Sequence, residues 1–325
     1  MIGTDEVLKV MYGTDEVSSL SMGEETIPIT PPTPPAPDYS SMPFTIEVGG
    51  NDNTSRALRF WNNTISNTSR TYYYSLNGGQ KTLFTIDDTN KFFNLTVKSG
   101  DTISFTVPND QGGTATDYNK YYAFVENTGL EYKVYGNIMS LCYVDFESAT
   151  TIPNDYCFYY LFTGNSSVVD AENLIIPLAD KANSYKSMFK NCTNLATAPE
   201  LPTESLGNYC YNSMFFGCTG LTSGPTILPA TVLKYACYQQ MFYNCTSLTT
   251  APELPNTTKR GTSCCSAMFQ GCTNLNYVKC LATTTTNTTN WLDGVSATGT
   301  FVKDANTTWS SGVNGIPTGW TVVDA

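Results

Sequence analysis

The chain has 325 residues, of which only 14% are charged, and it carries a formal net charge of −11 with no histidine. Because there is no basic stripe to displace counterions from phosphates, the composition predicts no nucleic-acid binding. Without histidine, Ser-His-Asp and Cys-His catalysis are excluded, and neither a metal nor a cofactor is expected. No window approaches 18 apolar residues, so we expect no insertion into a membrane.

Three units of about ten residues fill the N-terminus. Gly3-Thr-Asp-Glu-Val7 is followed by Gly13-Thr-Asp-Glu-Val17 and then by Gly23-Glu-Glu-Thr26, and each unit predicts a turn and a short strand. So few residues cannot build a core, so residues 1–26 should become ordered by pairing with identical chains or with a partner. A frayed tail is the alternative. The residues expected to make this anchor are Val7, Leu8, Val10, Met11, Val17 and Leu20.

The first nine residues do not have the features of a secretory signal. Met1-Ile-Gly-Thr-Asp-Glu-Val-Leu-Lys9 contains neither a basic n-region nor an apolar core. Unless a leader has been removed, export by the general pathway is not expected.

A proline-rich spacer is predicted over residues 27–40. Six prolines fall within the eleven residues from Ile27 to Pro37, and they favour an extended polyproline II conformation. Such a spacer holds two parts of a protein apart, so it is the clearest boundary in the chain.

Residues 41–143 have the alternating pattern of a small antiparallel β-sandwich. Turn signals at Asn77-Gly-Gly79 and Ser99-Gly-Asp101 separate short runs that are rich in aromatic and β-branched residues. Strands are predicted at 43–48, 58–61, 72–76, 81–86, 93–97, 102–107, 121–125 and 132–135.

One motif then recurs five times, most clearly as Cys210-Tyr-Asn-Ser-Met214-Phe215-Phe-Gly-Cys218-Thr219-Gly-Leu221. The equivalent positions 161, 188, 214, 241 and 268 are 27, 26, 27 and 27 residues apart. A fixed period of this length predicts a solenoid, here over residues 144–281. Within each copy, Tyr-x-x-Met-Phe predicts a short helical turn whose Met and Phe face inward. The proline-containing segments 195–202 and 248–255 should be extended and stack as one continuous parallel sheet.

Eight of the eleven cysteines occupy two fixed phases of the repeat. Positions 157, 210, 237 and 264 form one phase, and positions 192, 218, 245 and 272 form the other. Equivalent positions in stacked repeats lie about one strand spacing apart, so we expect ladders of buried thiols that act as small apolar side chains. Disulfides between the two phases are the alternative, whereas zinc is disfavoured because there is no C-x2-C pair.

After Cys280 the sequence repeat dissolves, and a different tail follows. Residues 282–325 contain Trp291, Phe301, Trp309 and Trp320. These aromatic side chains have the bulk to seal the open end of a solenoid, so a C-terminal cap is predicted. The expected fold class is therefore mainly β with short helical turns: a β anchor segment, an antiparallel sandwich, a solenoid and a cap.

The motifs Met-Phe-x-Asn/Gly-Cys-Thr-x-Leu and Ala-Pro-Glu-Leu-Pro resemble the BspA-type leucine-rich repeats of Bacteroidetes surface proteins and their phages. The resemblance covers about residues 157–280, and the Trp291–Trp320 tail looks like the ending of such arrays. The N-terminal units, the proline spacer and Pro43-Phe-Thr-Ile-Glu-Val48 are similar to virion-attached head or tail fibre proteins of Bacteroides (crAss-like) phages.

This resemblance implies a non-enzymatic virion protein, such as a head fibre, tail fibre or capsid decoration protein. Residues 1–26 would dock on the capsid or tail, the chain would form a homo-oligomer, and the repeats would contact a glycan or protein of the host surface. The protein would be made in the host cytoplasm and exposed on the particle. A secreted bacterial adhesin whose leader is missing is the alternative, and a glycan depolymerase is a further one.

Candidate ligand-binding residues come from the repeats. The extended segments 195–201, 221–228 and 248–254 should form the most regular surface, and exposed Tyr211, Tyr238 and Tyr243 could stack on sugars unless they pack between repeats. Glu200 and Glu253 occupy equivalent positions two repeats apart. Because the copy between them carries Thr226-Ile-Leu, a paired active site is not evident.

Overall fold

A computed structural model of the chain describes residues 19–22, 25–28, 37–50, 54–62, 69–117, 120–125, 127, 129–202, 204–257 and 259–325. The chain divides into two compact units, Met1–Asp38 and Tyr39–Ala325, and the division falls within the predicted spacer. The described residues are mainly β and form several sheets, as the sequence predicted.

The first unit contains an antiparallel hairpin of β1 (Ser19–Met22) and β2 (Glu25–Pro28), in which Leu20 lies opposite Ile27. Leu20 therefore belongs to a paired strand. The other expected anchor residues, Val7, Leu8, Val10, Met11 and Val17, lie outside the described residues.

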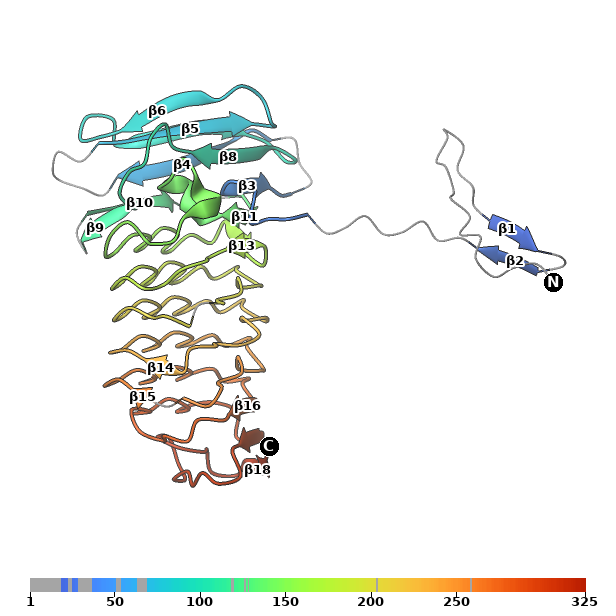
Figure 1. Cartoon of the computed structure of the whole chain (residues 1–325), viewed down its shortest axis with the longest axis vertical. Coiled ribbons are helices and arrows are strands. Elements are labelled where there is room, and N and C mark those ends of the chain that lie inside the picture. The colour runs from blue at the N-terminus through green and yellow to red at the C-terminus, as the bar shows by residue number, and fades with distance from the viewer. Residues whose placement is uncertain are drawn as a thin grey trace. The chain divides into compact units, whose positions relative to one another are not determined.

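The second unit begins with two sheets that pack against each other (Figure 1). One sheet has the order β7-β4-β10-β9 and is antiparallel throughout, and the other has the order β12-β11-β3-β8-β5-β6, with β12 and β13 parallel to β11. All eight predicted strands are present, whereas β9, β12 and β13 were not predicted. In chain order the strands are β3 (Thr45–Val48), β4 (Arg56–Asn62), β5 (Arg70–Leu76), β6 (Thr82–Ile86), β7 (Phe92–Val97), β8 (Thr102–Thr106), β9 (Ala115–Asp117), β10 (Lys120–Val125), β11 (Tyr132–Asn137), β12 (Val168–Asp170) and β13 (Leu174–Ile175).

Two short 3-10 helices, η1 (Ile138–Leu141) and η2 (Phe146–Ser148), connect the sheets to the repeats. Asn137 caps η1, because its side-chain oxygen accepts a hydrogen bond from the Met139 N–H at 3.0 Å. The connection is therefore fixed locally before the first repeat begins.

Each repeat contributes one turn segment, here called a rung, and the five rungs are residues 156–164, 183–191, 209–217, 236–244 and 263–271. In the second rung, alternate backbone N–H groups donate to the next rung: Tyr185 to Cys210, Ser187 to Asn212 and Phe189 to Met214, at 2.9 Å each. The intervening N–H groups close turns within the rung, such as Met188 to Tyr185 at 3.1 Å. Half of the donors therefore join neighbouring rungs.

The rungs are not helical, so the predicted helical turn is wrong. Every fourth residue has a left-handed backbone, as at Asn183 (φ 57°), Ser187 (φ 57°) and Asn191 (φ 60°). A helix would direct every N–H along its own axis, whereas this backbone turns alternate N–H groups toward the adjacent rung. The inward orientation of Met and Phe is confirmed, because Met188, Met214, Met241 and Met268 are fully buried with their neighbouring phenylalanines.

The extended segments pair less than predicted. Parallel contacts within them occur as isolated bridges, including Thr197 with Ser223 and Thr250 with Tyr277. The two-residue pair β14 (Val232–Leu233) and β15 (Lys259–Arg260) lies at a different position of the repeat. The prediction of one continuous sheet is wrong here. The prolines that make these segments extended also lack the N–H that a continuous ladder needs.

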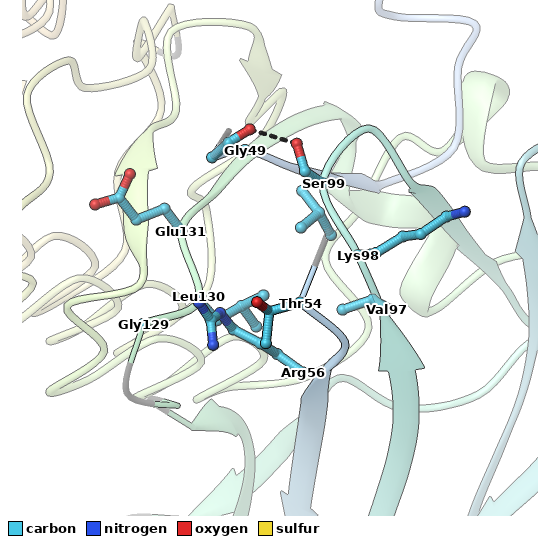
Figure 2. Close-up of a pocket in the computed structure, with 11 residues that line it drawn as sticks. Gly49, Thr54, Arg56, Val97, Lys98, Ser99, Gly129, Leu130 and Glu131 are labelled. Carbon is cyan, nitrogen blue, oxygen red and sulfur yellow. Dashed lines mark hydrogen bonds between the residues drawn. The ribbon is translucent and has the colours of Figure 1, made fainter. Parts of the chain in front are cut away.

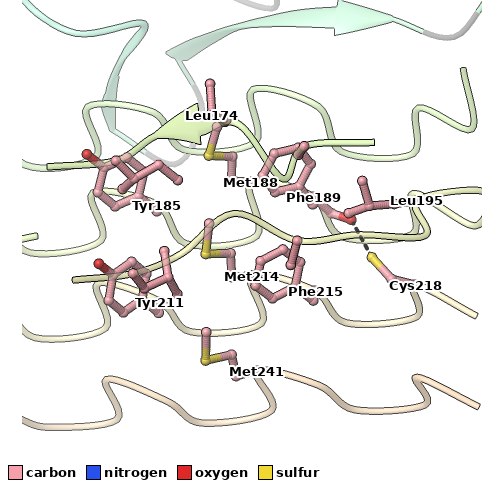
Figure 3. Close-up of a cluster of buried hydrophobic side chains, with 14 of the residues drawn as sticks. Leu174, Tyr185, Met188, Phe189, Leu195, Tyr211, Met214, Phe215, Cys218 and Met241 are labelled. Carbon is pink, nitrogen blue, oxygen red and sulfur yellow. Dashed lines mark hydrogen bonds between the residues drawn. The ribbon is translucent and has the colours of Figure 1, made fainter. Parts of the chain in front are cut away.

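One core runs through the whole second unit. Phe162, Phe189, Phe215, Phe242 and Phe269 stack in a column, with centroids 5.1 Å apart for the first pair and 5.7 Å apart for the second. Figure 3 shows Phe189 and Phe215 of this column. The column continues into the sheets, where Phe124 stacks 5.5 Å from Phe162 and Phe60 stacks 4.4 Å from Phe124. The sheets and the repeats therefore share a single hydrophobic interior.

The backbone pattern continues beyond the point where the sequence repeat ends. Ala267, Phe269 and Gly271 donate to carbonyls of residues 289, 291 and 293, so a sixth rung follows Leu281. Trp291 takes the place of the repeat methionine and stacks on Trp309 at 5.2 Å. The sequence motif does end after Cys280, but the expectation that the repeat ends there is wrong for the backbone, which forms one more rung.

The strands β16 (Tyr277–Cys280), β17 (Thr300–Lys303) and β18 (Thr321–Asp324) complete the unit as a parallel sheet. Buried Phe301, Trp309 and Trp320 cover this end together with Trp291.

We expect Phe215→Ala to lower the free energy of unfolding of the second unit by about 3–5 kcal/mol, because it removes a ring from the middle of the buried column. Phe216→Ala is the matched control: its ring is half-buried and stacks only at the surface, on Tyr243, so a loss of about 1 kcal/mol is expected. Urea unfolding followed by circular dichroism measures both. Equal losses would contradict the assignment of the column as the core.

Candidate functional site

Two of the three candidate sugar-stacking tyrosines lie inside the protein. Tyr211 and Tyr238 are each 1% exposed, and their rings stack on one another at 6.1 Å. Tyr211 also stacks on Tyr185 at 5.8 Å (Figure 3). The alternative that these side chains pack between repeats is therefore confirmed for Tyr211 and Tyr238, and their rings are not available to a sugar.

Tyr243 is half-buried at the surface of its rung. Its ring lies 4.6 Å from that of Phe216 and only 3° from parallel, and Lys190 lies over the Phe216 ring at 4.8 Å. One face of Tyr243 is therefore covered by its own neighbour. A ring with one face covered in this way offers less surface to a sugar than a free ring does.

The two candidate carboxylates interact with different partners. Glu200 accepts hydrogen bonds from the Thr226 N–H at 2.9 Å and from its hydroxyl at 2.7 Å. Glu253 forms an ion pair with Lys279 at 3.0 Å. Each carboxylate thus links its repeat to the next one, and nothing in this arrangement pairs the two as acid and base.

All eleven cysteines are buried free thiols. In the second phase, each thiol donates to the carbonyl of the phenylalanine in the preceding rung, as Cys218 does to Phe189 at 3.0 Å and Cys245 does to Phe215 at 3.1 Å. Burial raises the pKa of Cys272 to about 12 and that of Cys280 to about 11. These thiols fill space and satisfy carbonyls, and they are poor nucleophiles because the thiolate is disfavoured.

A polar cavity of about 380 Å³ lies where three loops of the two-sheet region meet (Figure 2). It is lined by residues 48–50, 97–99 and 129–131, with Thr54 and Arg56 from the start of β4. Its rim is fixed by backbone hydrogen bonds, from Gly49 to Glu131 at 2.8 Å and from Gly100 to Val48 at 2.9 Å. The cavity is therefore preformed.

Arg56 is one of the two cationic residues that line this cavity, and it lies beside Gly129. Gly129 has a positive φ of 77°, and a Cβ atom there would lie 3.2 Å from the guanidinium carbon of Arg56. The glycine thus leaves room for Arg56, whereas Lys98 and Glu131 extend to opposite sides (Figure 2). Sequence reasoning missed this cavity because its parts come from three distant loops, and only the turn signal at Ser99-Gly-Asp101 pointed to one of them.

Across the described ranges, no group of three or more His, Cys, Asp or Glu side chains is placed to hold a metal ion. In the same part of the chain, no helix has both the length and the apolar character needed to cross a membrane.

Comparison with protein-family models, curated proteins and solved structures gives no match to this chain. The functional argument therefore depends on the residues and geometry described above.

We expect the stability of the second unit to be flat between pH 6 and 8 and to fall steeply between pH 9 and 11. Unfolded thiols ionise near pH 9, whereas burial keeps the folded pKa of Cys272 at about 12 and that of Cys280 at about 11. Over this window the unfolded chain releases protons that the folded chain retains, so each such thiol lowers the free energy of unfolding by up to about 1.4 kcal/mol per pH unit.

Urea unfolding midpoints recorded from pH 6 to 11 test this expectation. Cys280→Ala removes one of the buried thiols, so the free energy of unfolding should fall less steeply with pH by the contribution of that one thiol. A midpoint that stays constant to pH 11, or one that falls already between pH 6 and 8, would contradict it.

Proposed function

We propose that the chain is a non-enzymatic phage virion protein, a head or tail fibre, with residues 1–26 docked on the capsid or tail. The observation that carries this proposal is the division into a small N-terminal unit and a large body, Tyr39–Ala325, with its own continuous core. The small unit contains a two-stranded hairpin, which is marginally stable alone in water. Such a hairpin gains stability when its edges pair with another chain.

In this proposal, the repeats and the sixth rung form a leucine-rich-repeat-like solenoid of the BspA type. The hydrogen bonds that join rungs 26 or 27 residues apart support this interpretation, for example Tyr211 to Cys237 and Phe242 to Met268. Each rung leaves donors and acceptors for its neighbours, so the array needs covered ends. The two sheets cover one end of the array, where the Phe124 N–H donates to the Leu161 carbonyl at 2.8 Å. The tryptophan-rich tail is the cap that covers the other end.

The body would be displayed to the host, where it binds a surface glycan or protein. Charges on the repeats are partly neutralised by contacts between rungs, such as Glu253 with Lys279, which suits a weakly charged partner. Many copies on one particle, and a homo-oligomer at each attachment point, would convert weak contacts into avidity. The protein would thus be made in the host cytoplasm and exposed on the virion.

We expect a chain that lacks residues 1–36 to fold normally but to be at least tenfold depleted from purified particles of the phage that encodes it. The body keeps its own core, whereas the proposed anchor is lost. Quantitative mass spectrometry of gradient-purified particles measures incorporation, and circular dichroism checks the fold. As a control, replacing Pro31, Pro32, Pro34 and Pro35 by alanine keeps the anchor and should leave incorporation unchanged.

If the full chain is absent from the particles, or if the shortened chain is incorporated equally well, the proposal is wrong. Recovery of the chain from the bacterial surface without particles would instead support the secreted adhesin.

A further inference from the structure

A continuous group of aromatic side chains lies at the surface where the β7-β4-β10-β9 sheet meets the first rung. Trp61 lies 6.2 Å from Phe92 and 6.3 Å from Tyr121, and Tyr121 lies 5.1 Å from Tyr160. Tyr159 stacks on Tyr160 at 3.9 Å, and Tyr156 lies 5.7 Å from Tyr159. Tyr159 is only 5% exposed and belongs to the interior. We call the other five rings the aromatic platform: Trp61, Phe92, Tyr121, Tyr156 and Tyr160.

The platform is separate from the core of the sheets. On β4, Leu58 and Phe60 point inward and are at most 1% exposed, so strand alternation places Trp61 on the outer face. Phe92 lies opposite Trp61 in the strand register and is 52% exposed. A phenylalanine this exposed, beside a tryptophan, adds nothing to the interior.

Local backbone features bring the remaining rings to the same place. The pairing of β10 with β9 shifts register between Lys120 and Tyr121. Irregularities of this kind re-aim side chains and are common beside binding sites. They therefore offer a reason why the Tyr121 ring reaches both Trp61 on its sheet and Tyr160 on the first rung.

The first rung also differs from the next one at its left-handed positions. Tyr156 (φ 62°) and Tyr160 (φ 61°) stand where the second rung has Asn183 and Ser187. Bulky residues are disfavoured in this backbone region, and asparagine is among the residues that tolerate it best. Tyr209 (φ 56°) holds the position equivalent to Tyr156 in the third rung, so one left-handed tyrosine is also accommodated away from the platform. Among the five rungs, the first has tyrosine at both of these positions.

We propose that the aromatic platform binds a neutral polysaccharide or oligosaccharide. Sugar rings offer apolar C–H faces that pack on aromatic rings, and their hydroxyls pair with phenol and indole groups. None of the five platform side chains carries a charge at neutral pH, and the net charge of −11 disfavours an acidic polymer. Because aromatic residues are also enriched in protein interfaces, the polysaccharide gels described below decide between a glycan and a protein partner.

Two further observations fit this ligand class. Burial raises the pKa of Tyr121, so its hydroxyl stays protonated and can donate even at an alkaline pH where an ordinary phenol begins to ionise. The platform spans a sheet and a rung that share one core, so its rings are held in place before a ligand arrives. The inference depends on the proposed function only for the biological source of the glycan, since binding is a property of the isolated chain.

Affinity electrophoresis of the full chain in gels that contain mannan, galactomannan, laminarin or arabinogalactan tests the proposal, with alginate as the acidic comparison. We expect retardation in at least one neutral gel. Trp61→Ala and Tyr121→Ala should weaken it by about fivefold or more, and Trp61→Phe should retain part of it. Tyr277→Ala is the matched control, because Tyr277 is 37% exposed but lies on the extended segment of a repeat.

Tryptophan fluorescence supplies a second measurement. The other tryptophans, 291, 309 and 320, lie in the C-terminal tail, so a neutral polysaccharide that binds the platform should change the emission of Trp61 and give no change in Trp61→Phe. An unchanged thermal midpoint shows that the alanine variants remain folded.

The proposal is wrong if no neutral gel retards the chain, if only alginate does, or if Trp61→Ala is retarded as strongly as the unaltered chain. Absence of the chain from particles would overturn the virion proposal but would not affect these results.

Discussion

The hydrogen bonds between rungs set the register on which the rest of the second unit depends. Because alternate N–H groups of one rung meet carbonyls of the next, each side chain lies directly beside its equivalent 26 or 27 residues later. Phenylalanine therefore stacks on phenylalanine, and Tyr185, Tyr211 and Tyr238 form a second ladder. Stacked aromatic pairs add to the stability that burial alone provides. The motif is thus repeated in the sequence because the same backbone register recurs in every rung.

This register also determines how the stack must end. A terminal rung would leave polar backbone groups and a ring face exposed, which is costly where water is partly excluded. At one end, Ala115 and Phe124 from the β7-β4-β10-β9 sheet donate to carbonyls of the first rung. At the other, the Trp291 indole N–H donates to the Gly315 carbonyl at 2.8 Å, and Trp309 covers its ring. Sheets and tail therefore complete the interior that the repeats begin.

The sequence revealed those features that depend on periodicity or strand alternation. A period of 27 located the rungs and the buried thiols, and alternating runs located eight strands. The direction of Tyr211 was left open between an exposed and a buried position. Every fourth rung residue is left-handed, and the Tyr, Asn, Ser, Ala and Gln residues at those positions do not by themselves reveal which way the neighbouring side chains point. The sixth rung was missed because Trp291 replaces methionine. The alternation of buried and exposed residues on β4 is visible in the sequence and places Trp61 on the outer face of the sheet. The cavity at Arg56 is not visible in the sequence, because it is formed by three loops that come together only in the folded chain.

The same register separates the two roles that aromatic residues have in this chain. Within the stack, rings lie face to face along the ladder, so Phe216 and Tyr243 cover one another even where they reach the surface. The regular part of the repeats therefore offers few free ring faces to a ligand that packs on them. The ladder order breaks at the junction with the sheets, where Tyr121 meets Tyr159 and Tyr160 nearly edge-on, and the proposed platform lies there. Stability thus comes from the repetition of the motif, and recognition is expected where that repetition first departs from it.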